Sequence, residues 1–211
     1  MGPTVTRKIS ILLFTLILLT SLLGQEGHLE SGVMAGLNMG QFSSKFPGST
    51  SNNRLKTGII AGGYVQTPLH PQLWMRGELI YTQKGNRIES DSNAGLITTD
   101  YLLHYISANI TGRYLPVKRL VLYFGPQASY LLSAAWNTSG ASGESSGSST
   151  DEFKPLEIGV LGGVAYQVSG NWEIQFRYEF GLSNLFNSEL GEQYNLQNRV
   201  MSFILAYTFT D

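Results

Sequence analysis

Charged residues that alternate with large apolar residues are the chain's densest source of possible chemistry. In Trp172–Leu182 (WEIQFRYEFGL), Glu173, Arg177 and Glu179 share one parity of the sequence, and aromatic or aliphatic residues occupy the other. Alternate side chains of an extended strand lie on opposite faces, so these charges would gather on one face. They can form ion pairs there, and they must do so if the face is buried, because an unpaired buried charge is costly.

The same alternation adds polar residues from other segments to this face. The expected polar network consists of Arg76, Glu78, Asn109, Arg113, Glu157, Glu173, Gln175, Arg177 and Glu179. If the strands close into an eight-stranded barrel, its lumen is just wide enough for side chains to fill. We therefore interpret the network as a structural plug of ion pairs and hydrogen bonds. A gated narrow pore or a proton path is the alternative.

Catalytic chemistry has one weak candidate, His104 with Ser107 and Asp100 nearby, since outer-membrane hydrolases can place Ser, His and an acid together on a strand. His104 and Ser107 are three positions apart in sequence, so they should point to opposite faces. No spacing of His, Asp and Glu suggests a metal site. The sequence thus predicts no catalytic, cofactor-binding or metal-binding residue, no cofactor and no enzyme.

Eight strand-like segments would position these residues. They lie near residues 32–40, 57–67, 72–84, 100–114, 119–136, 154–168, 171–184 and 198–209. Their connections alternate between long ones (41–56, 85–99, 137–153 and 185–197) and short ones (68–71, 115–118 and 169–170). Membrane barrels combine short periplasmic turns with longer extracellular loops. The pattern predicts an all-β fold: an eight-stranded antiparallel up-and-down transmembrane β-barrel in a bacterial outer membrane, with both termini periplasmic.

One long connection has an unusual composition. Residues 137–153 (NTSGASGESSGSSTDEF) are rich in Ser and Gly. Such a segment cannot bury a core and is typical of flexible chain. We expect it to form a flexible extracellular loop.

The start of the chain predicts a cleavable signal peptide over residues 1–24, followed by a barrel domain over residues 25–211. Arg7 and Lys8 precede an apolar run that ends before Gly24, and this run is shorter than the roughly twenty residues of a membrane-spanning helix. A retained N-terminal anchor is the alternative. The formal net charge is −1, which gives no electrostatic footprint for nucleic acid.

Aromatic residues occupy the apolar faces, many of them close to strand ends. Those expected to anchor the barrel at the two membrane interfaces are Tyr81, Tyr114, Tyr130, Tyr166, Trp172, Tyr178, Tyr207 and Phe209, and Tyr64 and Trp136 are interpreted in the same way. Trp136, next to a long connection, has a second interpretation as a platform for a sugar.

Five segments carry a resemblance to a known family. They are GVMAGLNMG at 32–40, GELIYTQKGNRI at 77–88, DYLLHYISANITGRY at 100–114, YFGPQASYLL at 123–132 and RVMSFILAYTF at 199–209. Through them the chain resembles the PorT-like outer-membrane β-barrel family of Bacteroidota. The resemblance implies an eight-stranded barrel with periplasmic termini and, for some relatives, a link to type IX secretion and gliding motility. It implies no functional residue.

Together these observations favour a non-enzymatic integral outer-membrane protein that is structural or partner-binding and has a side-chain-filled lumen. The expected partners are outer-membrane lipid and an envelope protein of a secretion or motility complex. Two alternatives stay open. One is an accessory subunit of a type IX secretion or gliding complex, which would dock through periplasmic turns or an outer strand face. The other is a soluble lipocalin-like ligand-binding barrel.

Overall fold

The computed structural model describes residues 29–43, 52–92, 95–140, 143–148, 150, 152–185 and 196–209. The strands within them are β1 (Glu30–Ser43), β2 (Asn52–His70), β3 (Leu73–Ser92), β4 (Gly95–Val117), β5 (Leu120–Gly140), β6 (Gly143–Ser148), β7 (Leu156–Gln167), β8 (Trp172–Gly181) and β9 (Gln197–Phe209). The predicted signal peptide lies outside the described residues. Among those residues, no helix is long and apolar enough to cross a membrane.

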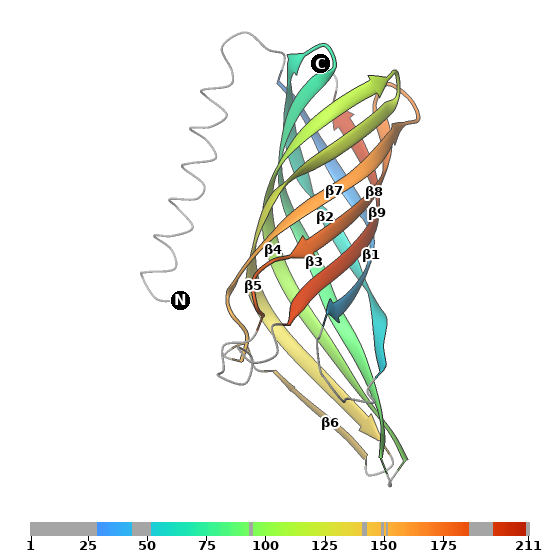
Figure 1. The fold of residues 1–211 in the computed structure, drawn as a ribbon, viewed down its shortest axis with the longest axis vertical. Helices are drawn as coiled ribbons and strands as arrows, with labels where there is room; N and C mark the ends of the chain where they lie inside the picture. The colour runs from blue at the N-terminus through green and yellow to red at the C-terminus, as the bar shows by residue number, and fades with distance from the viewer. Residues whose placement is uncertain are drawn as a thin grey trace.

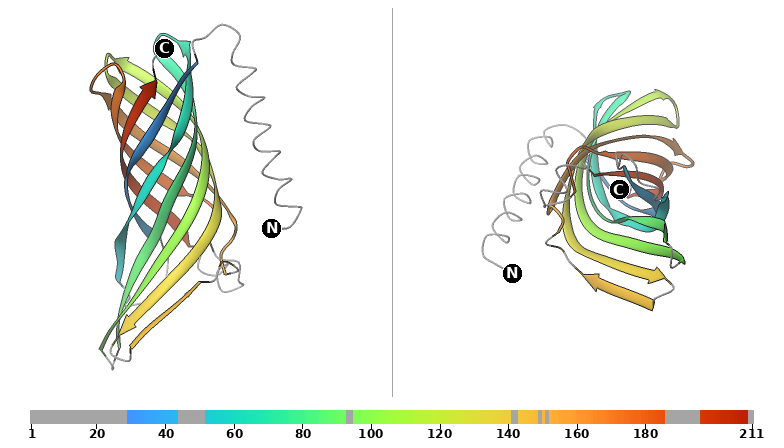
Figure 2. Two further views of the ribbon diagram at one scale, coloured as in Figure 1. Left: turned by 180° about the vertical axis from the view of Figure 1, so that it is seen from behind. Right: turned by 60° about the horizontal axis from the view of Figure 1, so that its bottom comes forward.

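Eight of the strands close into an antiparallel ring in the order β1-β2-β3-β4-β5-β7-β8-β9 (Figures 1 and 2). The ring is closed by β1 and β9, which pair from Ser31 and Phe209 to Ser43 and Gln197. Glycine permits this close pairing at Gly36, where a Cβ atom would collide with the carbonyl oxygen of Phe203. The predicted eight-stranded up-and-down barrel is therefore confirmed, and β6 is an additional strand outside the ring.

The polarity of the wall is the reverse of that of a soluble barrel. Along β8, the polar residues are buried in the lumen, while Trp172, Ile174, Phe176 and Tyr178 are exposed on the outside. The same alternation runs along β5, where Phe124 is 64% exposed. Large apolar side chains that cover the outside of a closed ring need an apolar solvent, since soluble proteins avoid contiguous apolar surface of this size. A soluble lipocalin-like barrel would place these residues inside.

The two ends of the barrel differ. Both termini of the ring lie beside the short turns after β2, β4 and β7 (Figure 1). In the two-residue turn between β4 and β5, Arg119 has a φ of 79°, a left-handed conformation that such tight hairpins require. We call the end of the barrel with the short turns and both termini the terminal end. The opposite end, which carries the longer connections, is called the loop end.

The predicted loop at residues 85–99 is wrong for most of its length. β3 continues to Ser92 and β4 begins at Gly95, and the two strands stay paired throughout. Cross-strand ion pairs hold this polar hairpin: Arg87 binds Asp100 through two hydrogen bonds of 2.8 and 2.9 Å. This segment shows no apolar alternation because cross-strand polar contacts, rather than burial, stabilise the extension.

The predicted loop at residues 137–153 is also wrong in part. β5 continues to Gly140, and β6 pairs with it from Ala135 and Ser148 to Gly140 and Gly143. Further along, the same edge of β5 pairs with β7 from Tyr130 and Leu156. Thus β6 and β7 lie one after the other along β5, separated by residues 149–155. Main-chain hydrogen bonds are sufficient to hold a hairpin of small polar residues. The Ser- and Gly-rich composition alone therefore did not predict this hairpin.

These extensions form a sheet that continues past the ring at the loop end (Figures 1 and 2). It comprises residues 52–55, 86–92, 95–101, 135–140 and 143–148, and we call it the protruding sheet. In the described part of the chain, β6 forms one edge of this sheet and the start of β2 forms the other.

The reversed polarity can be tested with one charge on the outside of the wall. Leu205 lies on β9, points outward and is 47% exposed. We expect Leu205→Arg to lower the free energy of unfolding in lipid vesicles by about 2–4 kcal/mol, and Val117→Arg, at a strand end, by about 0–1 kcal/mol. A soluble barrel would tolerate both changes, so an unchanged stability of Leu205→Arg would contradict the membrane orientation.

Candidate functional site

All nine residues of the predicted polar network lie inside the ring. Each is buried, and the most exposed of them, Glu173, is 8% exposed. They come from β3, β4, β7 and β8, and strand parity alone places them there. The structure joins most of them through ion pairs and hydrogen bonds in three groups stacked along the lumen.

The first group lies nearest the terminal end. Glu173 accepts hydrogen bonds from Arg113 (Nη2 to Oε2, 2.6 Å) and from Arg76 (Nη1 to Oε1, 3.3 Å). Arg76 also donates to Oε1 of Gln66 at 2.6 and 2.8 Å. Its guanidinium carbon lies 3.9 Å from the ring centre of Tyr64, which adds a cation–π contact. A single carboxylate thus compensates two guanidinium groups.

The second group is a buried ion pair at the middle of the lumen. Nη2 of Arg177 lies 2.8 Å from Oε1 of Glu78, and both side chains are fully buried. Asn109 donates to the other carboxylate oxygen of Glu78 at 3.0 Å. Gln175 accepts a hydrogen bond of 3.5 Å from Arg177.

The third group lies nearest the loop end and contains a residue that the sequence interpretation missed. Nζ of Lys84 lies 3.2 Å from Oε1 of Glu157 and 3.3 Å from Oε2 of Glu179. Asn198 donates to Oε2 of Glu157 at 2.7 Å. Strand parity could have identified Lys84, which lies six positions after Glu78, but the predicted strand ended there.

The buried charges of the lumen balance within the described residues. Four cations (Arg76, Lys84, Arg113 and Arg177) face four acids (Glu78, Glu157, Glu173 and Glu179), and each acid contacts at least one cation. Glu30, which is partly exposed at the terminal end, adds one acid that accepts a hydrogen bond of 2.7 Å from Gln66. Both signs of charge therefore line the described lumen, which lacks the single-sign ring by which a pore would select ions.

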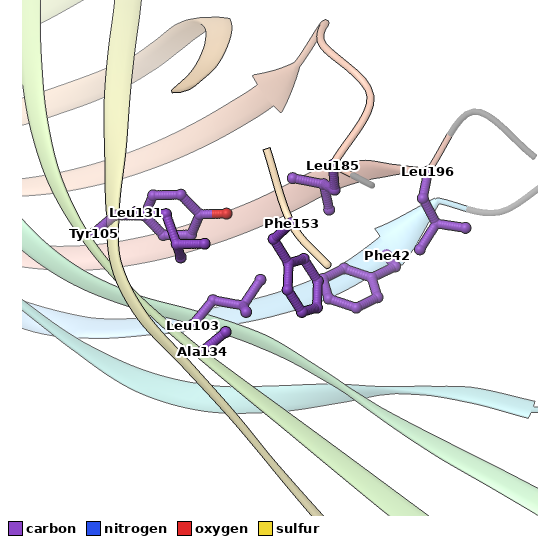
Figure 3. Packing of buried hydrophobic residues seen from close by; sticks show 8 residues of the cluster. All are labelled: Phe42, Leu103, Tyr105, Leu131, Ala134, Phe153, Leu185 and Leu196. Carbon is purple, nitrogen blue, oxygen red and sulfur yellow. The ribbon is translucent and has the colours of Figure 1, made fainter. Parts of the chain in front are cut away.

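Apolar side chains close the loop end of the lumen (Figure 3). This apolar cap consists of Phe42, Leu103, Tyr105, Leu131, Ala134, Phe153, Leu185 and Leu196. Phe153 lies between β6 and β7, so the interruption of that edge carries an aromatic ring into the barrel, where it packs against Tyr101 at 6.4 Å between ring centres. The sequence interpretation missed the cap because half of its residues come from the predicted connections, which carry no strand alternation: Phe42, Phe153, Leu185 and Leu196.

The candidate catalytic residues His104 and Ser107 do not come together in the structure. His104 lies on the outside, with Nδ1 2.5 Å from the hydroxyl of Tyr81, whereas Ser107 is buried inside and donates to Ser129 at 2.7 Å. The two side chains therefore lie on opposite faces. Among the described residues, no group of three or more His, Cys, Asp or Glu could hold a metal ion.

The eight predicted interface aromatics all point outward. Five of them lie beside the turns and strand ends of the terminal end: Tyr114, Tyr166, Trp172, Tyr207 and Phe209. The ring centres of Trp172 and Tyr207 lie 4.8 Å apart, and those of Tyr207 and Phe209 lie 5.7 Å apart. Their role at a membrane interface stays a prediction.

Tyr64 does not belong to this set. It is buried inside the barrel against Arg76, and its hydroxyl lies 2.7 Å from Oγ1 of Thr208. The Gly-rich sequence around it (TGIIAGGYVQT) has no clear alternation, so parity could not assign its face.

A family model for the outer membrane protein beta-barrel domain matches residues 23–187. The chain therefore belongs to this family, and it is a bacterial outer-membrane β-barrel protein. No curated protein matches the chain in sequence.

Solved structures agree with this fold. The chain is similar to Ail, the attachment invasion locus protein of Yersinia pestis, with 15% identity and a TM-score of 0.51, over 88% of this chain and 100% of that one. It is also similar to Neisserial surface protein A, with 17% identity and a TM-score of 0.50, over 85% of this chain and 97% of that one. At these identities the likeness concerns the fold alone.

The central ion pair can be tested by removing one or both partners. We expect Arg177→Met to cost about 3–5 kcal/mol of unfolding free energy, because it leaves the Glu78 carboxylate buried without its cation. Adding Glu78→Gln should recover part of this loss.

The exposed pair of Arg54 and Glu89 provides a matched control, with an N–O distance of 2.6 Å and an Arg54 side chain that is 64% exposed. Arg54→Met should cost no more than about 1 kcal/mol. Chemical unfolding followed by the mobility shift between folded and heated protein measures all three variants. Equal losses for Arg177→Met and Arg54→Met would contradict a structural plug.

The protruding sheet should respond to acid through Asp100. Hydrogen bonds from Arg87 hold the pKa of Asp100 below its usual 3.8, against partial burial, which raises it. A carboxyl with a lowered pKa stabilises the folded state above its unfolded pKa, and that contribution is lost as the pH falls through the lowered value. We expect amide protection in this sheet to fall as the pH drops below about 3.8. The same acid dependence in Asp100→Asn would contradict this origin.

Proposed function

We propose that this protein is a non-enzymatic outer-membrane anchor that does not conduct ions and that holds the protruding sheet outside the cell, where the sheet binds a partner. The observation that carries the proposal is the combination of a filled lumen with a sheet that continues beyond the ring. A transport protein would need an open or charged path, and an enzyme would need reactive groups that converge.

The contacts in the lumen support the proposal that the barrel does not conduct ions. Its four cations and four acids are paired, and the apolar cap lies over them at the loop end. Opening this path would separate buried ion pairs, which is costly. The predicted polar network thus acts as the plug that keeps the small barrel rigid.

Orientation follows from the difference between the two ends. In outer-membrane barrels the short turns are periplasmic and the longer connections are extracellular. The terminal end would then face the periplasm, and the protruding sheet would lie outside the cell. A signal peptide over residues 1–24 and a barrel domain over residues 25–211 belong to the same proposal, because the chain must be exported to reach this membrane.

The protruding sheet supports the partner-binding part. It is not needed to close the ring, yet ion pairs at Arg87 and Asp100 and at Lys56 and Asp100 hold its strands together. β6 gives it one extended edge whose side chains are small apart from Glu144, without the Lys or Pro that commonly block sheet edges.

A second candidate is an accessory role in a secretion or motility complex. It rests on the resemblance to the PorT-like family of Bacteroidota and would make an envelope protein the partner. The contact would then lie at the periplasmic turns, where Lys118 and Arg119 are exposed, or on an outer strand face.

Conductance tests the closed lumen. We expect the full chain, reconstituted in planar lipid bilayers, to pass no ion current, because an ion would have to separate the buried ion pairs and pass the apolar cap. Stable single-channel current from the unmodified protein would contradict the proposal.

Photocrosslinking separates the two candidate functions. We expect a photoreactive amino acid in place of Ser146, on β6, to crosslink to extracellular material in intact cells, and the same residue in place of Lys118 to give no product. Crosslinking at Lys118 alone, to a periplasmic or membrane protein, would overturn an external role and favour the accessory subunit.

A further inference from the structure

The protruding sheet keeps all its described charges on one face. Arg87, Glu89 and Asp100 alternate with inward residues along β3 and β4 and lie on the outer face. Glu144 of β6 shares this face, since it pairs with Ser139. The opposite face continues the inner wall of the barrel, and we call it the lumen-side face. It carries Asn86, Ile88, Thr99, Tyr101, Trp136, Thr138, Ser145 and Gly147, none of them charged.

Two aromatic residues are cross-strand neighbours on the lumen-side face. Tyr101 and Trp136 are direct cross-strand partners of β4 and β5. Tyr101 packs on the apolar cap, with ring centres 6.1 Å from Phe42 and 6.4 Å from Phe153. The indole of Trp136 lies against Gly147, where a Cβ atom would come within 2.7 Å of it. Both rings are therefore held in place from one side, and both keep part of their surface accessible.

Hydroxyl groups border the aromatic pair. Oγ1 of Thr99 and Oγ1 of Thr138 lie 3.0 Å apart, two register positions beyond the rings and on the same face. Ser145 pairs with Thr138 on the same face and is exposed. A hydroxyl can both donate and accept a hydrogen bond, so this border can match a ligand that itself consists of hydroxyls.

We propose that the lumen-side face of the protruding sheet binds a neutral oligosaccharide. The weakly positive C–H face of a pyranose ring packs on the negative face of an aromatic ring, and its hydroxyls match Thr and Ser. An anionic glycan would need cations, which the described side chains of this face lack. The proposal rests on the proposed function, and it names the chemical class of the extracellular partner.

The ligand comes from outside rather than from the protein's own membrane. The lumen-side face is turned toward the barrel axis, whereas lipids and the polysaccharides attached to them surround the outer face of the wall. The charged outer face, with Arg87 and Asp100, would meet those lipids first.

An array of neutral and acidic oligosaccharides, probed with the full chain in lipid nanodiscs, tests the proposal. We expect binding to a subset of neutral sugars and a loss of about tenfold or more for Trp136→Ala. Thr138→Val should weaken binding without changing the barrel, as measured by the mobility shift on heating. Trp172→Phe, at the other end of the barrel, is the matched control and should bind as the unmodified protein does.

Three results would overturn the proposal: no neutral sugar bound, acidic sugars alone bound, or undiminished binding by Trp136→Ala. These results are distinct from failure of the proposed function. Crosslinking at position 146 to an extracellular protein, together with no sugar bound on the array, would support the proposed anchor function and contradict the proposed glycan ligand. Ion current through the unmodified barrel would contradict the proposal that the lumen is closed, whereas the sugar array tests the glycan ligand separately.

Discussion

Pairing of β1 with β9 imposes the constraint on which the other features depend. Once the ring is closed, each strand has one face toward a narrow lumen and one toward the surroundings. Charged residues on the lumen face must then be paired, and the other face must be apolar, because the membrane offers no water to solvate it. The ion pairs of Glu78, Glu173 and Lys84 and the apolar wall are two consequences of the same closure.

The ring and much of its lumen could be predicted because strand parity is a local property of the sequence. In β8, Glu173 and Arg177 are two of four consecutive inward residues, and each contacts a partner from a distant strand. Parity assigns a face but not a partner, so the pairing of Arg177 with Glu78, 99 residues earlier, required the strand register. Where glycines interrupt the alternation, as around Tyr64, even the face was assigned wrongly.

Apart from the inward face of Tyr64, the features that the sequence did not predict lie at the loop end. The hairpin of β5 and β6 is held by main-chain hydrogen bonds, which any small polar residue can make, so its Ser and Gly composition suggested flexibility instead. Phe153 was missed because it belongs to no strand and reaches the lumen only through the interruption between β6 and β7. Long-range packing of single residues leaves no periodic signal.

The central claim is that alternate residues of each strand face the membrane and the lumen, with the apolar ones outside. Quenching by lipids along β8 tests this most directly. The chain has no cysteine, so a fluorophore can be attached to single cysteines introduced at successive positions from Trp172 to Phe180, with brominated lipids as the quencher. The account predicts strong quenching at Ile174, Phe176 and Tyr178 and weak quenching at the positions between them. Strong quenching at the positions of Gln175 and Arg177, or no alternation at all, would contradict it.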